Sequence, residues 1–439
     1  MEWLFTFCAI LGGLLILMMI GMPIAFAFLL VTSVGVFLLQ GGGNAFQQQI
    51  ISMISSVSSF ALVPIPLFIL MGTVLWHSNI GKQAIEALDK LLGRLPGRLS
   101  LLTMASGSVF SALSGSTMAN TALLGKLLLP QMEQRGYSRD LSMGPIMAAG
   151  GLAMMIPPSA IAVVLASIAK LSIAKILIAA IIPGLMMAAG YVLYIVVRSM
   201  ADSKAAPTGS ETLSTWSEAL SAMARNLLPL GIIIFSVTGL IILGIATPTE
   251  AAAMGALSSF LLAALYRRLS VRMMIDSLMD TMRISIMMFA ILAGALGFSQ
   301  ILAYSGATTG LLGAVFSWDV QPTLVIVSMM LVVLVLGCFM DQIAIMLITF
   351  PFFLPIINSL GYNPIWFAIL MLINLETALM TPPLGLLLVI MKGAAPADTS
   401  FGDIYKAALP FVVINILVIA LLIAFPEMIT IPIAALSAR

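Results

Sequence analysis

Apolar stretches long enough to cross a lipid bilayer recur along most of this chain of 439 residues. Hydrophobic residues make up 61% of the sequence and charged residues only 8%, against about 25% charged residues in a soluble domain. Because an apolar helix of about 20 residues spans the hydrocarbon core of a membrane, lipid is the solvent for most of this chain. The sequence therefore predicts an all-α, polytopic membrane protein. A formal net charge of +2 indicates no nucleic-acid partner.

The two halves of the chain resemble each other at one constant offset in residue number. The stretch LPQMEQRGYS at 129–138 matches LPIINSLGYN at 354–363. The same offset places Pro157-Pro158 on Pro382-Pro383. With 22 prolines in the chain, about half a proline match is expected at any one offset by chance, whereas four fall in membrane segments. The sequence therefore predicts two repeats of one fold.

The predicted repeats, residues 1–199 and 225–439, are joined by a long polar segment at 200–224, which is typical of a linker. The segment 77–98 holds four Lys or Arg residues, and its counterpart at 302–323 holds none. Because basic loops stay on the cytoplasmic side of a membrane, corresponding loops of the two repeats must lie on opposite sides. We therefore predict two repeats of inverted topology, with a cytoplasmic linker between them.

An inverted repeat needs an odd number of crossings, so one segment of each repeat must enter and leave on the same side. In the first repeat that segment is 99–132, which has basic flanks and small polar residues in its middle. Non-helical backbone at this depth must be buried in protein or line a wet cavity, which predicts a re-entrant helical hairpin. By symmetry the second hairpin covers 322–357. In this arrangement Lys170 and Lys175 fall outside, against the positive-inside rule.

Each repeat also contains a helix interrupted by two adjacent prolines, at 141–166 and at 365–391. Proline lacks an N–H and clashes with the carbonyl four residues back, so the second pair is expected to free the carbonyls of Ala378 and Leu379. For one such pair alone, a plain kink is the simpler interpretation. A broken helix and a polar hairpin tip that occur together in both halves instead indicate the midplane ion and substrate sites of a secondary transporter.

Four stretches in order carry a family resemblance: SGSTMANTALLG, GIATPTEAAAMGAL, FMDQIAIMLITFPFFLPI and INLETALMTPPLGLLL. Over essentially its whole length, the chain resembles the large membrane (M) subunit of tripartite ATP-independent periplasmic (TRAP) transporters. The resemblance implies an elevator-type, sodium-coupled importer of an organic acid, such as a dicarboxylate or sialic acid. It also implies a location in the bacterial inner membrane and two partners, a small membrane (Q) subunit and a periplasmic substrate-binding (P) protein.

The sequence gives no indication of an enzyme. One histidine excludes an HExxH zinc site, and neither Gly-Lys pair is followed by the Ser or Thr of a phosphate-binding loop. We therefore expect no cofactor, with Na⁺ as a coupling ion. Two alternatives stay open: a stand-alone sodium/dicarboxylate symporter, which needs no binding protein, and a channel, whose flux is neither saturable nor dependent on a counter-ion.

The candidate ligands concentrate at the hairpin tips and the helix breaks. Sodium is a hard cation that prefers oxygen, which hydroxyls and freed carbonyls supply, and Thr381 beside the second break is the strongest single candidate. Helix N-termini after the tips can hold an anionic substrate, although polar residues there can equally be turn residues or N-caps. The predicted sodium ligands are Ser114, Thr117, Gly337, Met340, Ala378, Leu379 and Thr381, and the predicted substrate-binding residues are Ser116, Asn120, Asp341 and Ser159.

Two glutamates in the apolar segments have separate interpretations. Glu250 follows Thr247-Pro248, which is typical of the first turn of a helix. Glu376 lies inside the second broken helix and leaves open whether protons contribute to coupling.

Overall fold

The computed structural model describes the whole chain except residues 1, 93, 94, 96, 115, 203, 208–219, 318–320, 339, 384, 438 and 439. Within the described residues every regular element is a helix. Seven of these helices are long and apolar enough to cross a membrane, and four shorter apolar helices accompany them. The predicted class, an all-α polytopic membrane protein, is confirmed.

The described helices divide into a set before residue 208 and a set after residue 219. The first set is α1 (Glu2–Met19), α2 (Ile24–Gln40), α3 (Asn44–Val57), α4 (Pro64–His77), α5 (Ile80–Leu92), α6 (Arg98–Ser114), α7 (Thr117–Gln134), α8 (Arg139–Gly151), α9 (Ala160–Ile168) and α10 (Ile173–Ala201). The second set is α12 (Leu228–Ile242), α13 (Pro248–Leu265), α14 (Val271–Tyr304), α15 (Ala307–Ser317), α16 (Pro322–Gly337), α17 (Gln342–Ser359), α18 (Pro364–Leu379), α19 (Leu386–Ala394), α20 (Phe401–Ala424) and α21 (Glu427–Ser437). Three short turns complete the order: the 3₁₀ turns η1 (Phe60–Leu62) and η2 (Leu152–Met154), and the π-helical turn η3 (Met223–Leu227). Most of the predicted linker at 200–224 lies outside the described residues.

Proline and glycine fix several helix ends, as expected for residues that preset or relax the backbone. Gly136 follows α7 and Gly361 follows α17, each with φ at +76°. After each glycine a tyrosine N–H reaches back to a carbonyl five residues earlier, from Tyr137 to Met132 at 3.0 Å and from Tyr362 to Ile357 at 3.1 Å. This is the Schellman ending, in which the left-handed position favours glycine.

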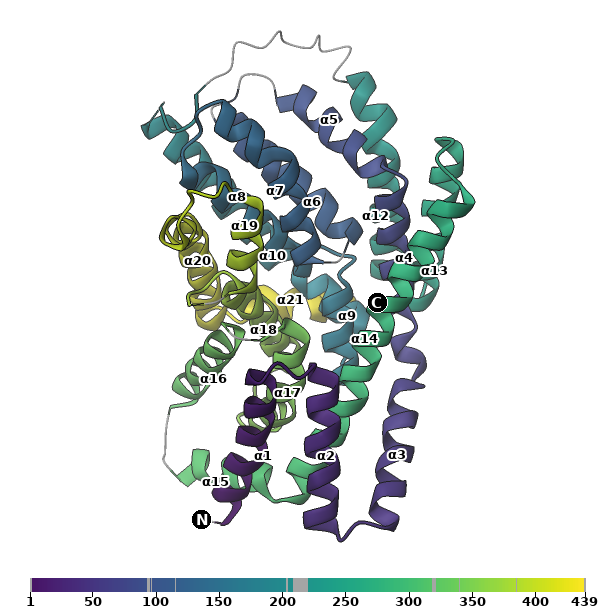
Figure 1. Cartoon of the computed structure of the whole chain (residues 1–439), viewed down its shortest axis with the longest axis vertical. Helices are drawn as coiled ribbons and strands as arrows, with labels where there is room; N and C mark the ends of the chain where they lie inside the picture. The colour runs from purple at the N-terminus through teal and green to yellow at the C-terminus, as the bar shows by residue number, and fades with distance from the viewer. Residues whose placement is uncertain are drawn as a thin grey trace.

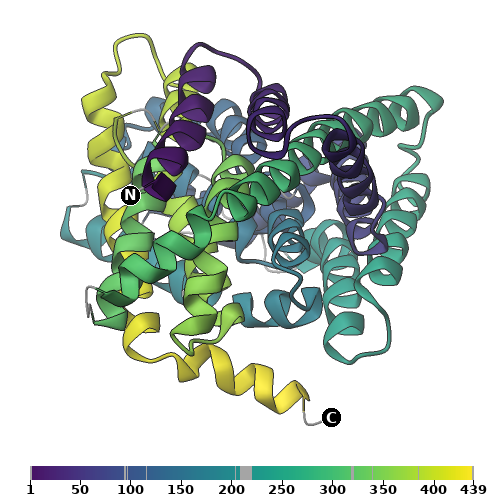
Figure 2. The ribbon, with the colours of Figure 1, turned by 90° about the horizontal axis from the view of Figure 1, so that it is seen from below.

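The helices form two layers that stand side by side in Figure 1. We call α2–α4 with α12–α14 the scaffold, and α6–α10 with α16–α20 the bundle. Both layers mix the two sets of helices, because α13 packs on α4, α14 on α2, α20 on α8 and α19 on α7. Seen from below, the long helix α14 runs from the scaffold towards the bundle, where it contacts α17 (Figure 2).

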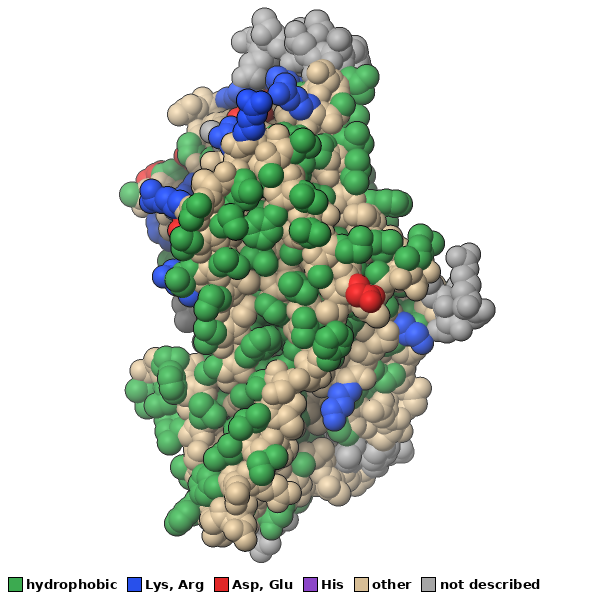
Figure 3. Space-filling view, turned by 90° about the vertical axis from the view of Figure 1, so that its right-hand side faces the viewer, with side chains coloured by type: hydrophobic (Ala, Val, Ile, Leu, Met, Phe, Trp, Pro, Cys, Tyr) green, Lys and Arg blue, Asp and Glu red, His purple; other side chains and the backbone are tan. Residues whose placement is uncertain are grey.

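The surface on the scaffold side is suited to lipid. Figure 3 shows hydrophobic side chains over most of this face, with Lys and Arg gathered mainly towards its upper end. Exposed large apolar side chains on α12, α13 and α14 include Phe235, Leu265 and Ile286, which are 80%, 77% and 62% exposed. Such exposure is ordinary for a helix whose solvent is hydrocarbon.

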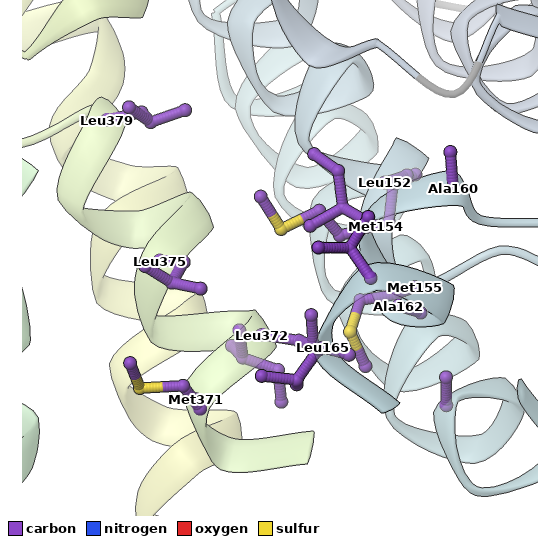
Figure 4. Close-up of a cluster of buried hydrophobic side chains, with 14 of the residues drawn as sticks. Leu152, Met154, Met155, Ala160, Ala162, Leu165, Met371, Leu372, Leu375 and Leu379 are labelled. Carbon is purple, nitrogen blue, oxygen red and sulfur yellow. The ribbon is translucent and has the colours of Figure 1, made fainter. Parts of the chain in front are cut away.

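The core of the bundle lies where the two interrupted helices meet. Side chains of α18, among them Met371 and Leu372, lie opposite those of η2 and α9, including Met154 and Leu165 (Figure 4). These four side chains are fully buried. The packing holds both helix breaks at one place in the molecule, and it therefore positions the site described next.

The helix boundaries of the two halves repeat at the same offset in residue number as the matching stretches of sequence. The offset that places Pro157 on Pro382 also places both ends of α7 on the ends of α17, and the segment formed by α8 and η2 on α18. The helices α6 and α7 occupy the stretch predicted for the first hairpin, and α16 and α17 occupy that of the second. The inverted orientation of the two halves stays a prediction.

One local interpretation of the sequence is confirmed at the start of α13. The Thr247 N–H donates to Glu250 Oε2 at 2.8 Å, and the Glu250 N–H donates to Thr247 Oγ1 at 3.3 Å. This reciprocal pair is a capping box, so Glu250 serves the helix start, as its sequence position indicates.

Candidate substrate and cation site

A cavity of about 420 Å³ lies between the scaffold and the bundle, and we call it the first cavity. Residues of α4 and α14 line it from the scaffold, and the first residues of α7, α9 and α17 line it from the bundle. The N–H groups of a first helical turn have no partner within the helix, and the helix dipole is positive at that end. Three such ends directed at one cavity favour an anion there, and Arg283 also lines it. The two carboxylates of the lining have partners, because Asp280 lies 2.9 Å from His77 Nε2 and Asp341 caps α17.

The residue before each of these three helices is an N-cap. Ser116 accepts the Ala119 N–H at 3.3 Å, Ser159 accepts the Ala162 N–H at 3.3 Å, and Asp341 accepts the Ile343 N–H at 3.1 Å. A cap satisfies only part of the unpaired N–H groups of the first turn. Of the three, Ser116 and Asp341 line the first cavity, whereas Ser159 is buried and is not among the described residues that line it.

Asn120 is directed into the bundle rather than the first cavity. Its Nδ2 donates to the carbonyls of Gly107, at 3.0 Å, and Ala149, at 3.4 Å. The side chain is 1% exposed, and it ties α7 to α6 and α8. The structure thus assigns Asn120 packing contacts, and the predicted contact of Asn120 with substrate stays a prediction.

A single buried carboxylate connects the two hairpin tips. Glu376 Oε2 accepts the Thr117 hydroxyl at 3.2 Å and the Gln342 Nε2 at 3.3 Å. Glu376 is fully buried, and its Oε1 has no hydrogen-bond partner among the described residues. On its other side the carboxylate packs on Gly151, where an added Cβ would lie 2.7 Å from Oε1. Glu376 therefore joins the starts of α7 and α17 to α18 and fills the space that Gly151 leaves.

The second hairpin tip lies directly on the second helix break. A Cβ added to Gly337 would lie 2.2 Å from the Cβ of Ala378, so only glycine allows this approach. One residue later, Cys338 Sγ is 3.0 Å from the Pro382 carbonyl oxygen, and Met340 is buried. The structure therefore brings the predicted ligands Gly337 and Ala378 together.

The backbone hydrogen bonds before Thr381 differ from those expected from the sequence. The Thr381 N–H donates to the Ala378 carbonyl at 3.1 Å, so the expectation that this carbonyl is free is wrong. The physical reason is that the last turn of α18 tightens to three-residue hydrogen bonds before the prolines. The Thr381 hydroxyl donates to the Thr377 carbonyl at 2.7 Å, and this leaves its oxygen lone pairs available.

Two carbonyl oxygens converge beside Gly385. The oxygens of Leu379 and Thr381 lie 2.3 Å and 2.8 Å from the position that a Cβ on Gly385 would take. A Cβ would collide with both oxygens, so only glycine lets the backbone pass this close to them. The backbone oxygens of Leu379 and Thr381 thus both lie beside Gly385, whereas the Thr381 hydroxyl, which is the predicted sodium ligand, donates to the Thr377 carbonyl.

At the first tip, α6 ends at Ser114 and α7 begins at Thr117. The side chain of Ser114 and all of residue 115 lie outside what the structure describes. Thr117 is 1% exposed, contacts Glu376 and lines the first cavity. The first tip thus shares both its carboxylate contact and its cavity with the second.

The model of the family described as "Tripartite ATP-independent periplasmic transporter, DctM component" matches residues 11–428. This chain belongs to that family. It is therefore a TRAP transporter large permease and not an enzyme.

Two relatives illustrate the likeness of this TRAP permease to curated proteins. The ectoine TRAP transporter large permease protein TeaC of Halomonas elongata is 30% identical over 412 residues, which cover 94% of this chain and 95% of TeaC. The C4-dicarboxylate TRAP transporter large permease protein DctM of Pseudomonas aeruginosa is 30% identical over 378 residues, which cover 86% of this chain and 87% of DctM.

A solved structure shares the fold of the TRAP permease. The YdaH transporter of Alcanivorax borkumensis aligns with a TM-score of 0.67 over 91% of this chain and 96% of that chain. Sequence identity is 13%, so the likeness concerns the fold alone.

Two features of the TRAP permease site were missed by the sequence analysis. Gly385 follows the second proline pair closely in TPPLG, and a glycine there indicates a close backbone approach. Glu376 was noted only for proton coupling, although a carboxylate inside an apolar span indicates a polar partner on a neighbouring helix. Its two partners, Thr117 and Gln342, become visible only in the fold.

Proposed function

We propose that this chain is the sodium-coupled permease subunit that carries an organic acid across the bacterial inner membrane. The observation that carries the proposal is the convergence of α7, α9 and α17 on the first cavity, which favours an anion through the dipoles of three helix starts. Membership of the TRAP family supports secondary transport of organic acids. The relative named as a C4-dicarboxylate transporter supports a carboxylate substrate.

In this proposal, the substrate carboxylate lies at the helix starts after Ser116 and Asp341, both of which line the first cavity. Sodium lies at the second break, beside the carbonyls of Leu379 and Thr381 and the lone pairs of the Thr381 hydroxyl, where Gly337 packs on Ala378. The hydroxyls of Ser114 and Thr117 supply the corresponding oxygens at the first tip. Because ion and substrate share the hairpin tips, binding of one orders the backbone that binds the other.

We further propose that the two halves are inverted repeats and that transport uses an elevator movement of the bundle against the scaffold. The recurrence of helix bounds at one constant offset supports the repeats. The division into two layers, with the first cavity at their boundary, supports the movement. Glu376 supports a bundle that moves as one body, because it joins both hairpin tips.

The proposed partners follow from the tripartite family. A small membrane (Q) subunit lies in the lipid beside the large one, and a periplasmic substrate-binding (P) protein delivers the acid. The apolar face of the scaffold in Figure 3 offers a membrane-embedded surface for the small subunit. The permease and the binding protein then both contribute to the specificity for the acid.

Reconstitution tests this assignment. In liposomes that hold the chain alone, we expect no uptake of a labelled C4-dicarboxylate. Uptake is expected when the small subunit, the loaded binding protein and an inward sodium gradient are all present. Robust uptake by the chain alone would favour a stand-alone symporter, and flux that neither saturates nor depends on sodium would favour a channel.

Cysteine labelling tests the inverted topology. Single cysteines at Asn79 and Arg268 are expected to react only from the cytoplasmic side, because both lie in the basic segments of the two halves. Single cysteines at Gly43 and Asn358 are expected to react only from the periplasmic side. Labelling of Gly43 and Arg268 from the same side would exclude inverted repeats.

A further inference from the structure

A second cavity, of about 500 Å³, lies on the other side of α9 from the first. Four of its lining residues are serines, one is lysine and eight are apolar. The serines are Ser55, Ser56, Ser59 and Ser167. No acidic residue is among the described residues that line it, whereas the first cavity is lined by Asp280 and Asp341 together with Arg283 and His77.

The short helix α9 separates the two cavities. Ala160 and Ile161 at its start line the first cavity, and Ala166, Ser167 and Ile168 at its end line the second. A helix of 9 residues is about 13 Å long, so the two cavities lie that far apart along the boundary of scaffold and bundle. Figure 1 shows α9 at the middle of the molecule beside α14.

The two cavities use corresponding surfaces of the scaffold. Ser55 and Ser59 line the second cavity, and their counterparts in the second repeat, Asp280 and Ile284, line the first. Because α4 ends at His77 in the proposed cytoplasmic loop, η1 at its other end lies nearer the periplasm. The second cavity is therefore the periplasmic counterpart of the first.

Lys170 supplies the charge of the second cavity. It is the one charged residue among the described lining residues, and its side chain is exposed. Its φ is +54°, a left-handed conformation that favours glycine or asparagine. The turn itself is closed by backbone hydrogen bonds, from the Leu171 N–H to the Ala166 carbonyl at 2.8 Å. The backbone at this point thus does not require a lysine side chain, and glycine would suit it better.

We propose that the second cavity is an outer binding site for a carboxylate, in which Lys170 supplies the positive charge and the hydroxyls of Ser56 and Ser59 donate hydrogen bonds. The hydroxyls of Ser55 and Ser167 already donate to the carbonyls of Ser52 and Val163. This inference rests on the proposed function, because it places the site on the path of an organic acid from the periplasm. A lysine among hydroxyls, in a cavity with no acid among its described lining residues, attracts an anion and retains it by a charge-assisted hydrogen bond. The acid then passes α9 to reach the helix starts of the first cavity.

The first experiment measures uptake of labelled succinate by the complete transporter in liposomes. Lys170→Gly removes the charge and suits the left-handed backbone, and it is expected to raise KM about 10-fold with little change in the maximal rate. Lys170→Arg is expected to keep the wild-type KM. The matched control is Lys175→Gln, which removes a nearby lysine that does not line the cavity. An unchanged KM in Lys170→Gly, or an equal rise in Lys175→Gln, would overturn the proposal.

The second experiment needs no transport. A single cysteine at Ser59, in a chain with Cys8 and Cys338 replaced, is treated with an anionic and a cationic methanethiosulfonate of similar size. Lys170→Gly is expected to lower the ratio of the anionic to the cationic reaction rate several-fold, and Lys175→Gln is expected to leave it unchanged. A ratio independent of Lys170 would refute the anion site. A ratio that depends on Lys170, in a complete transporter that shows no sodium-dependent uptake, would uphold the site and refute the proposed transport.

Discussion

Gly337→Ala is expected to abolish sodium-dependent uptake, with a loss of about 100-fold or more. The new methyl group would lie 2.2 Å from the Cβ of Ala378, so the second hairpin tip must move away from the helix break. Overpacking of this kind costs about 1–3 kcal/mol, which a large membrane protein tolerates. The variant is therefore expected to insert and to assemble with the small subunit, and the measurement is uptake in reconstituted liposomes.

Two further variants separate this effect from general damage. Gly231→Ala is the matched control, because a Cβ at that position meets no atom within 4 Å, and it is expected to transport like the wild type. Ala378→Gly in the Gly337→Ala background removes the opposing methyl group and is expected to restore most of the uptake. If the double variant stays inactive, transport does not depend on the close contact between the second hairpin tip at Gly337 and the helix break at Ala378.

Thr381→Val is expected to weaken the apparent affinity for sodium about 5- to 150-fold, because it keeps the shape of the side chain and removes its oxygen. Loss of one ligand oxygen from a desolvated cation corresponds to about 1–3 kcal/mol. The measurement is the sodium concentration that gives half-maximal uptake. Thr381→Ser keeps the hydroxyl, and with it the 2.7 Å hydrogen bond to the Thr377 carbonyl, and is expected to retain most of the affinity.

The thermal midpoint of the purified complex controls for the lost hydrogen bond to Thr377. A lower midpoint with unchanged sodium dependence would mean that Thr381 stabilises the end of α18 and binds no ion. In that case the cation site would move to the hairpin tips at Ser114 and Gly337.

Much of the helix pattern of this TRAP permease could be predicted, because proline and glycine mark it locally. The stretch predicted for the first hairpin was 99–132, and α6 and α7 run from Arg98 to Gln134. The second proline pair likewise separates α18 from α19. Helix starts can be predicted for the same reason, because Ser, Thr and Asp directly before a helix cap its first N–H groups whatever the tertiary fold.

The contacts within the candidate site could not be predicted in the same way. Thr117 and Glu376 are 259 residues apart in sequence, and their hydrogen bond depends on how two distant helices pack. The free Ala378 carbonyl was a wrong expectation because the rule for proline describes a regular helix, whereas the last turn of α18 is tighter. The sequence shows Lys170 only as a charge on the outer side, and no local pattern indicates that a cavity lies beside it.

Under the proposed repeats, Glu376 marks a position at which the two halves must differ. Gly151 is its counterpart at the constant sequence offset, and the two residues are in contact. A dimer of two identical halves would carry either two carboxylates at this point, which repel each other at close range, or two glycines, which leave the tips without an acceptor. A single chain with two non-identical halves lets each position hold a different residue. The present chain therefore cannot be reduced to a symmetric dimer of either half without loss of its central junction.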